Sequence, residues 1–322
     1  MILKAVSPEV LISQPTHSPT RVLFYRDYYG PTGGHYKLRD YINHTGHGAR
    51  YTPQLYLSPR SLQDGFWDSC CERVTSFDPC AADILFLAGL DWLALDAFPQ
   101  IEHNKPVINL IQGVRHADPV DPRFRFLDRR AVRICVSQSV AKAITATGLP
   151  AGPVVTIPIG QALPTILPPS NPEFDVFIAA TKNRELGEAL GSRLKSKGLR
   201  VFCNTQWMDH RAFLTGMASS RIAVTLPLAQ EGFFLPALEA MQLGCVVVCP
   251  DCIGNRDFCR DRETAIVPPY DLDGIEAAVM LVTRDDKLAQ RLIQCGRSQA
   301  ESHSLSSERD RYLNVLDEIV RS

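Results

Sequence analysis

Short apolar runs and longer amphipathic stretches alternate along most of the chain, and this alternation predicts its secondary structure. A helix is expected from His35, after a loop that ends in PTGG. In the first half, the apolar runs predict strands at 21–25 (RVLFY), 82–90, 105–113, 131–137 and 152–160. Near-continuous apolar strands separated by helical stretches are typical of a parallel sheet that is covered on both faces.

A proline-rich segment, QALPTILPPSNPEF at residues 161–174, interrupts the alternation and predicts a linker. The alternation then resumes, with strands expected at 175–181, 199–205, 221–227 and 245–249, helices at 184–198 and 208–220, and a helical tail from 271. We therefore predict an α/β protein built from two doubly wound, Rossmann-like halves. A cleft between such halves, at the carboxyl ends of their strands, is where a ligand is expected to bind.

Length and charge narrow the class of protein. A chain of 322 residues is long enough for two domains, and its formal net charge of −1 gives no overall field that would hold nucleic acid. No run reaches the roughly 18 apolar residues of a membrane span. The start, MILKAVSPEVLISQPTHSP, lacks the long apolar core of a signal peptide. We expect a cytoplasmic protein without a nucleic-acid partner.

The cysteines need a separate explanation, because the chain has ten of them. Several lie inside apolar strand-like runs, where cysteine behaves as a small hydrophobic residue. The segment CPDCIGNRDFC, residues 249–259, contains a Cys-x2-Cys pair that could bind zinc. A closed zinc site needs four ligands, however, and this segment supplies only one further cysteine. We expect a loop at the end of a strand and no metal.

The segment EGFFLPALEAMQLGCVVV, residues 231–248, carries the strongest functional signal. Pro236 suits the first turn of a helix and Gly244 suits its end, so a two-turn helix is predicted with Glu231 in the loop before it and Glu239 in its first turn. The free N–H groups at the start of that helix would form an anion site, which a diphosphate would fit. The alternative is that both acids simply stabilise a helix N-terminus.

This segment resembles the Glu-x7-Glu signature of retaining glycosyltransferases of the GT-B fold, most closely glycosyltransferase family 4. Weaker similarities to the same family lie at SQSVAKAI (137–144), VVTIPIG (154–160), GNRDF (254–258) and the closing segment 261–279. The resemblance implies a GT-B fold: an acceptor-side domain at 1–162, a donor-binding domain at 163–304, and a helix at about 305–322 that packs back on the first domain.

The resemblance also implies the roles of individual residues. Glu231 would contact hydroxyls of the transferred sugar as a catalytic residue, and Glu239 would bind the ribose of the nucleotide. Backbone N–H groups of the loop before the helix would face the sugar and phosphates; they belong to Gly232, Phe233, Phe234 and Leu235. The family uses neither a metal nor a cofactor, so the nucleoside-diphosphate sugar enters as donor substrate.

Lys182 and Arg184 follow the first predicted strand of the second half and are expected to bind the donor phosphates. Their order and spacing differ from the family's usual pattern, and a solvated pair at a helix start is the alternative. The distance from them to Glu231 is short for the family, so one strand–helix unit is expected to be missing.

In the first half, Gly33 and Gly34 follow a strand, where their backbone can approach a ligand closely, although a plain turn would have the same sequence. By simple alignment Gln112 falls where the family places a catalytic histidine, and His116 lies four residues later. His116 takes that role if the loop is longer than usual; a surface-loop histidine is the alternative.

The segment DPRFRFLDRRAVR, residues 121–133, gathers five arginines. It is compatible with peripheral contact to the inner face of a membrane, and a helix with a solvated basic face is the simpler interpretation.

The sequence as a whole predicts a retaining, metal-independent glycosyltransferase that moves a sugar from a nucleoside diphosphate to a hydroxyl of a glycan, lipid-linked or small-molecule acceptor. The alternatives are a non-catalytic protein that binds a sugar nucleotide or glycan, and another GT-B enzyme such as an epimerase.

Overall fold

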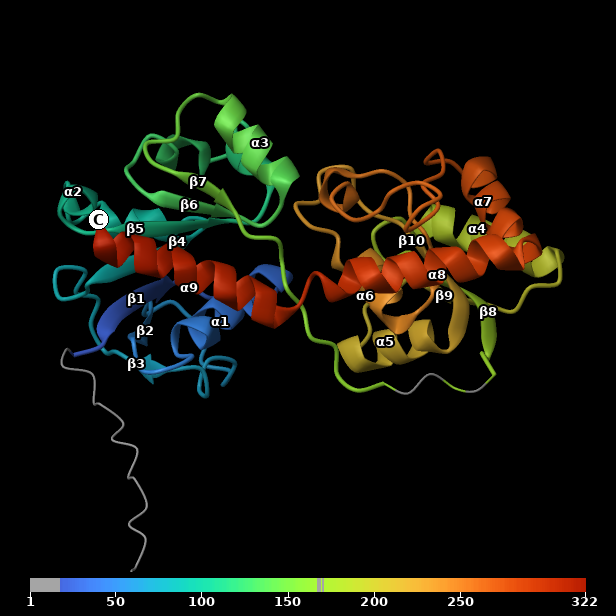
Figure 1. Ribbon diagram of the computed structural model, residues 1–322, viewed down its shortest axis with the longest axis horizontal. Helices are drawn as coiled ribbons and strands as arrows, with labels where there is room; N and C mark the ends of the chain where they lie inside the picture. The colour runs from blue at the N-terminus through green and yellow to red at the C-terminus, as the bar shows by residue number, and fades with distance from the viewer. Residues whose placement is uncertain (1–17, 167–168, 170) are drawn as a thin grey trace, which may run out of the picture.

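The computed structural model describes residues 18–166, 169 and 171–322, and the protein has two lobes of parallel sheet and helices (Figure 1). The amino-terminal segment that bears on the signal-peptide expectation lies almost wholly outside the described residues. Among the described residues no helix is long and apolar enough to cross a membrane.

The first lobe contains a seven-stranded sheet with the order β3-β2-β1-β4-β5-β6-β7, in which each strand is parallel to its neighbours. Its strands are β1 (Thr20–Arg26), β2 (Tyr51–Leu57), β3 (Glu72–Arg73), β4 (Ile84–Ala88), β5 (Val107–Ile111), β6 (Val132–Cys135) and β7 (Val154–Thr156). Its helices are α1 (Gly33–Thr45), α2 (Ile101–Asn104) and α3 (Gln138–Ala146), with short 3-10 helices η1 (Asp91–Leu95), η2 (Val114–Ala117) and η3 (Phe124–Phe126).

Alternating side chains of these strands fill two separate cores. Val22 and Phe24 of β1 point into a core formed with α1 and α3, whereas Leu23 points into a second core formed with η1, α2 and η3. The central strands β4 and β5 are buried throughout. This burial on both faces is what the near-continuous apolar runs predicted.

The second lobe contains a four-stranded parallel sheet with the order β11-β10-β8-β9. Its strands are β8 (Phe174–Ala179), β9 (Val201–Asn204), β10 (Ser220–Thr225) and β11 (Val246–Val248). Its helices are α4 (Arg184–Ser196), α5 (His210–Ala218), α6 (Leu235–Leu243), α7 (Leu272–Arg284) and α8 (Asp286–Glu301), with the 3-10 helix η4 (Ile253–Asn255). Helices α4, α7 and α8 cover one face of this sheet and α5 and α6 cover the other, so both lobes are doubly wound as predicted.

The last helix, α9 (Leu305–Arg321), lies against the first lobe (Figure 1). Its Glu308 is buried and accepts hydrogen bonds from Lys37 Nζ at 2.9 Å and His44 Nε2 at 3.0 Å, both on α1. The chain therefore crosses between the lobes twice, and the two crossings are paired: the Gln161 N–H donates to the His303 carbonyl at 2.8 Å.

Several predicted elements were wrong or were missed. Strand β2 and the edge strand β3 were not predicted, and the basic segment 121–133 is not a helix: it forms only the short η3 before β6. Arg133 is fully buried there, donating to backbone carbonyls that include those of Leu127 and Ala131, so it belongs to no solvated basic face. The last helix is capped by Ser304, whose side chain accepts the Ser307 N–H.

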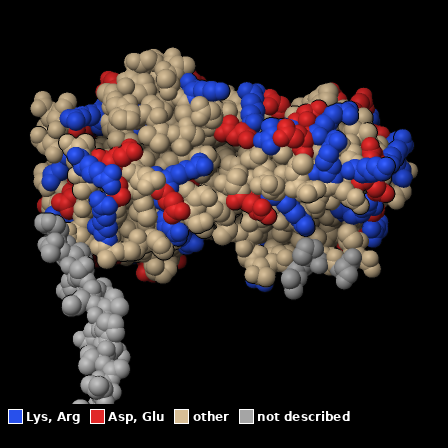
Figure 2. Space-filling view, viewed as in Figure 1, with Lys and Arg blue, Asp and Glu red and all other residues tan. Residues whose placement is uncertain are grey.

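Charged side chains of both signs are interspersed over the face drawn in Figure 2, in keeping with the net charge of −1. Isolated surface charges of this kind contribute little to stability.

Candidate functional site

The carboxyl ends of both sheets face each other across the junction of the lobes. The strand order reverses between β1 and β4 in the first sheet and between β8 and β10 in the second. Ligands of doubly wound proteins bind outside the carboxyl ends of strands at such reversals. The loops that follow these strands contain most of the residues that the sequence singled out.

Helix α6 begins at Leu235, with Pro236 in its first turn, and ends at Gly244, whose φ of 83° is a left-handed conformation that favours glycine. Because the helix starts one residue earlier than predicted, Glu239 lies in its second turn, not its first. The Glu239 side chain is only 8% exposed and accepts a hydrogen bond from His210 Nε2 at 2.8 Å. His210 begins α5, and this bond raises its pKa above the ordinary value.

Glu231 and Lys182 form an ion pair between the loops after β10 and β8. Lys182 Nζ lies 2.5 Å from Glu231 Oε1, with side chains 40% and 16% exposed, respectively. Glu231 Oε1 also accepts the Leu228 N–H at 3.2 Å, and Lys182 Nζ lies 5.3 Å from the centroid of the Phe234 ring. The two charges thus meet at the strand-order reversal of the second sheet.

Arg184 has a different environment from Lys182, although the two are close in sequence. Arg184 is the first residue of α4, and its Nη2 donates to the carbonyl of Thr205 at 3.3 Å, in the loop after β9. The pair therefore brackets the amino end of α4, with Lys182 toward Glu231 and Arg184 toward the β9 loop.

The loop of residues 231–235 is held tightly between the lobes. A Cβ atom at Gly232 would lie 1.9 Å from the Gln112 carbonyl oxygen, so the loop touches the backbone after β5 directly. The Phe234 N–H donates to the Gly254 carbonyl at 2.9 Å and is therefore already used. Phe233 and Leu235 pack against the core of the first lobe.

A second contact between the lobes lies at the amino end of α3. Asp257 of the second lobe accepts the Gln138 N–H at 2.7 Å and the Ser139 hydroxyl at 3.3 Å. Ser137 caps the same helix by accepting the Val140 N–H at 3.1 Å. Ser137 thus has a structural role, and Asp257 adds a carboxylate at the positive end of the helix.

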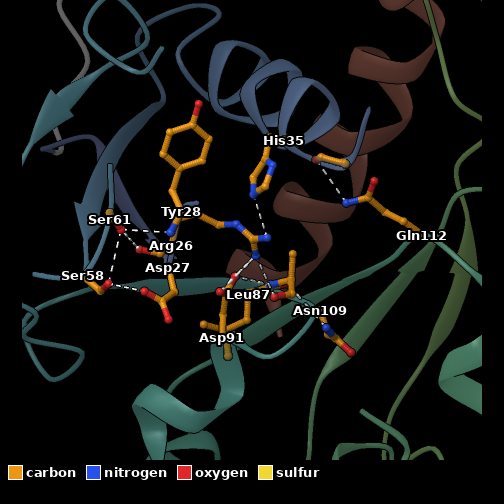
Figure 3. A network of polar contacts seen from close by, with 12 residues as sticks. Arg26, Asp27, Tyr28, His35, Ser58, Ser61, Leu87, Asp91, Asn109 and Gln112 are labelled. Atoms are coloured by element: carbon orange, nitrogen blue, oxygen red, sulfur yellow. Dashed lines mark hydrogen bonds and ion pairs between the residues drawn. The ribbon is translucent and has the colours of Figure 1, made fainter. Parts of the chain in front are cut away.

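Gly33 and Gly34 begin α1 beside Gln112. The space next to Gly33 is open, whereas a Cβ at Gly34 would lie 3.2 Å from the Gln112 side chain. Gln112 Nε2 donates to the Gly34 carbonyl at 3.3 Å (Figure 3). Gln112, and not His116, therefore lies beside the glycine loop.

His116 lies on η2 and is buried. Burial, with a smaller contribution from Arg123, lowers its pKa to about 3, so it is neutral near pH 7.

A charged network lies at the ends of β1 and β4 (Figure 3). Arg26 Nη1 donates to Asp91 Oδ2 at 3.0 Å, and Arg26 Nη2 lies 3.0 Å from His35 Nε2. Because a guanidinium can only donate, His35 Nε2 must accept, and its Nδ1 then donates to Thr32 Oγ1 at 2.8 Å. Burial and the adjacent Arg26 lower the pKa of His35 to about 4, so this imidazole is neutral.

The cysteine segment is a compact loop around η4. Cys249, Cys252 and Cys259 are buried free thiols, and burial raises the pKa of Cys252 to about 12. Among the residues described by the structure, no group of His, Cys, Asp and Glu side chains is arranged to hold a metal ion.

Three groups beside the candidate site were not singled out from the sequence: His210, the Arg26–Asp91 pair and Asp257. Arg26 could have been predicted from the sequence, because it ends the first strand immediately before the glycine loop. His210 had no such signal, since its partner lies 29 residues away, and Asp257 lies in the segment 254–258 already noted, but its partner is 119 residues away.

Residues 161–299 match the family model described as "Glycosyl transferases group 1". No curated protein matches the chain in sequence.

Solved structures match nearly the whole chain. Anabaena Alr3699/HepE in complex with UDP and glucose has a TM-score of 0.70 at 14% identity, covering 93% of this chain and 100% of that one. Sucrose-phosphate synthase from Thermosynechococcus elongatus has a TM-score of 0.69 at 12% identity (94% and 99% covered). The lipopolysaccharide outer core galactosyltransferase WaaB has 0.64 at 13% (93% and 99%). The fold is therefore the GT-B arrangement of two Rossmann-like domains.

Proposed function

We propose that the protein is a retaining, metal-independent glycosyltransferase that moves a sugar from a nucleoside diphosphate to an acceptor hydroxyl. The observation that carries the proposal is the Lys182–Glu231 pair, held at 2.5 Å at the strand-order reversal of the second sheet. A diphosphate needs a cation and a sugar hydroxyl needs an acceptor such as a carboxylate, and these two adjacent loops supply one of each. The family-model match over the same lobe supports this assignment.

In the proposed complex the sugar hydroxyls bind Glu231 and the diphosphate binds Lys182 and Arg184. The N–H groups of Gly232, Phe233 and Leu235 add donors at the start of α6, where the helix dipole favours negative charge. Phe234 packs under Lys182 and does not present its N–H, which is bonded to Gly254. Several of the similar structures contain UDP or UDP-glucose, so UDP-sugars are the first donors to test.

The reaction breaks the bond between the anomeric carbon and the diphosphate oxygen and forms a bond from the same carbon to the acceptor oxygen. The acceptor proton passes to the departing diphosphate on the same face of the sugar. Lys182 and Arg184 stabilise the negative charge that grows on that leaving group, which is the main electrostatic requirement of the step. The acceptor binds on the side of Gly33, Gly34 and Gln112.

His116 does not fit the role of catalytic base in this arrangement, because it is buried on η2. Gln112 lies beside the glycine loop instead and would orient the acceptor without taking its proton.

The test is transfer by Glu231→Gln with a matched control, Glu318→Gln, on the exposed side of α9. Donors are UDP-sugars first, then GDP- and ADP-sugars, and product anomers are analysed by NMR. We expect Glu231→Gln to lose at least about a hundredfold in kcat with unchanged thermal unfolding, the control to behave as wild type, and EDTA to have no effect. Full activity in Glu231→Gln would refute the assignment.

Two other results would favour the alternatives. Donor binding without hydrolysis or transfer would indicate a sugar-nucleotide binding protein, and an altered sugar configuration in the recovered donor would indicate an epimerase. An inverted product anomer would contradict the retaining mechanism.

A further inference from the structure

Tyr270 lies in the segment immediately before α7 and contacts the loop that contains Glu231. Its hydroxyl donates to the Pro227 carbonyl at 2.5 Å, and the residue is 39% exposed. Burial raises the pKa of this hydroxyl above its ordinary value, so it keeps its proton near pH 7 and can act as the donor. Tyr270 therefore fixes one backbone carbonyl of the loop after β10.

The peptide unit that accepts this bond also holds Glu231. Its carbonyl belongs to Pro227 and its N–H belongs to Leu228, which donates to Glu231 Oε1 at 3.2 Å. A trans peptide unit is planar, with its C=O and N–H pointing in opposite directions, so a bond that fixes one end also fixes the direction of the other. A hydrogen bond to the carbonyl also polarises the amide and strengthens the bond that its N–H donates. One peptide unit thus connects the Tyr270 hydroxyl to the Glu231 carboxylate.

The backbone on both sides of Tyr270 is constrained. Pro268 and Pro269 precede it, and Asp271 follows it as the N-cap of α7, accepting the Gly274 N–H at 2.7 Å. A Cβ at Gly274 would lie 3.0 Å from the Pro269 carbonyl oxygen, so the start of α7 packs closely against the prolines. The Tyr270 hydroxyl is therefore held by a rigid segment outside the loop that it contacts.

The peptide bond to Glu231 becomes more important once a donor binds. Glu231 Oε1 has two partners, Lys182 Nζ at 2.5 Å and the Leu228 N–H at 3.2 Å. The Lys182 side chain is 40% exposed and ends a flexible stem, and in the proposed complex it binds the diphosphate. The Leu228 N–H is then the partner that still orients the Glu231 carboxylate toward a sugar hydroxyl.

We propose that Tyr270 is a positioning residue that orients Glu231 for the transferred sugar, acting through the peptide unit between Pro227 and Leu228. This inference rests on the proposed function, because it concerns the carboxylate to which sugar binding is assigned. Since Tyr270 acts on Glu231 and not on Lys182, its hydroxyl should affect binding of the sugar part of the donor and leave binding of the nucleoside diphosphate part unchanged.

The first test compares Tyr270→Phe, which removes only the hydroxyl, with the control Tyr56→Phe on β2 of the first lobe. Calorimetry on the full-length proteins measures the affinities for UDP and UDP-glucose, and then for the GDP and ADP counterparts. Because one hydrogen bond is lost, we expect Tyr270→Phe to bind the sugar nucleotide about three- to tenfold more weakly and the diphosphate within about twofold of wild type. The control should bind both as wild type does. Equal weakening of both ligands by Tyr270→Phe would indicate a merely structural role and overturn the inference.

The second test is a double-mutant cycle with Glu231→Ala. This substitution removes both the acceptor of the Leu228 N–H and the proposed sugar contact. If Tyr270 acts through Glu231, adding Tyr270→Phe to Glu231→Ala should cause no further loss of affinity for the sugar nucleotide. A further loss of the same size as in the single variant would show that Tyr270 acts independently of Glu231, and the positioning role would be wrong.

The outcomes distinguish this inference from the proposed function. If Tyr270→Phe binds both ligands as wild type does while Glu231→Gln loses transfer, the positioning role is wrong and the glycosyltransferase proposal stands. If wild-type protein binds none of the nucleoside diphosphates and none of their sugar derivatives, both proposals fail.

Discussion

Two glycines of helix α4 provide a matched test of how this helix packs on the second sheet. Gly187 and Gly191 are one turn apart, and both are buried. A Cβ added at Gly187 would lie 2.1 Å from the Cβ of Ala180, just beyond β8. A Cβ added at Gly191 would lie 3.7 Å from its nearest neighbour, the Cβ of Cys203, which is an ordinary contact distance.

Alanine at either position should gain about 1 kcal/mol of helix propensity over glycine. At Gly187 the new methyl group must also move by roughly 1.5 Å to reach a normal carbon–carbon separation. Overpacking of this kind costs about 1–3 kcal/mol. We therefore expect Gly191→Ala to be neutral or stabilising by up to about 1 kcal/mol, and Gly187→Ala to be less stable than Gly191→Ala by about 1–3 kcal/mol.

The free energy of unfolding is measured by urea denaturation followed by far-UV circular dichroism, on single variants and on a double-mutant cycle with Ala180→Gly. Removing the Ala180 methyl group should make Gly187→Ala markedly less costly. Equal stability of Gly187→Ala and Gly191→Ala, or no relief in the double variant, would refute this account of the packing. Because Ala180 precedes Lys182 by two residues, Gly187→Ala should also weaken nucleotide binding, while Gly191→Ala should not.

Three further predictions concern the contacts between the lobes and the buried histidines. Gly232→Ala should weaken donor binding and lower the melting temperature, because its Cβ would lie 1.9 Å from the Gln112 carbonyl oxygen; calorimetry and thermal unfolding measure both, and wild-type values for both would contradict the close approach. Asp257→Ala should destabilise the protein by about 1 kcal/mol through loss of the bond to the Gln138 N–H, measured by urea denaturation, with Asp257→Asn losing less. His35 and His116 have folded pKa values of about 4 and about 3 and stay neutral where the unfolded chain binds protons. Their contribution to the free energy of unfolding is therefore present above the unfolded pKa of about 6.5. Below that pH it is lost by about 1.4 kcal/mol per pH unit for each histidine, because only the unfolded chain takes up the protons. Urea midpoints at pH 7 and pH 5 test this, and an unchanged midpoint would contradict it.

The repeated strands and helices could be read from the sequence because the central strands are apolar on both faces. Runs such as ILFLA in β4 and VINLI in β5 have no polar alternation to confuse the pattern. Strand β2, YTPQLYL, was missed because it alternates and contains Pro53, which lacks the N–H that a ladder uses. The helix predicted over the basic segment failed because Arg133 donates to backbone carbonyls inside the protein rather than to water.

The site was predictable only where its residues are close in sequence. Glu231, Glu239, Pro236 and Gly244 belong to one segment, so their spacing was visible. The partner of Glu239 could not be predicted, because His210 belongs to a different strand–helix unit. His210 contacts Glu239 only because α5 packs on α6. Spacing likewise could not show that Glu231 pairs with Lys182, which lies 49 residues earlier.

The second domain is inserted into the chain of the first lobe, and the two segments that connect the lobes lie side by side. The chain leaves the first lobe at Gln161 and returns at His303, and these residues are hydrogen-bonded at 2.8 Å. Residues 161–303 could therefore be excised and the cut ends joined by a very short linker, leaving α9 in place on α1. The first lobe would then be a continuous single-domain protein that still buries Glu308 beside Lys37. Its counterpart, a free second domain with adjacent ends, would allow nucleotide binding to be measured in the absence of the first lobe.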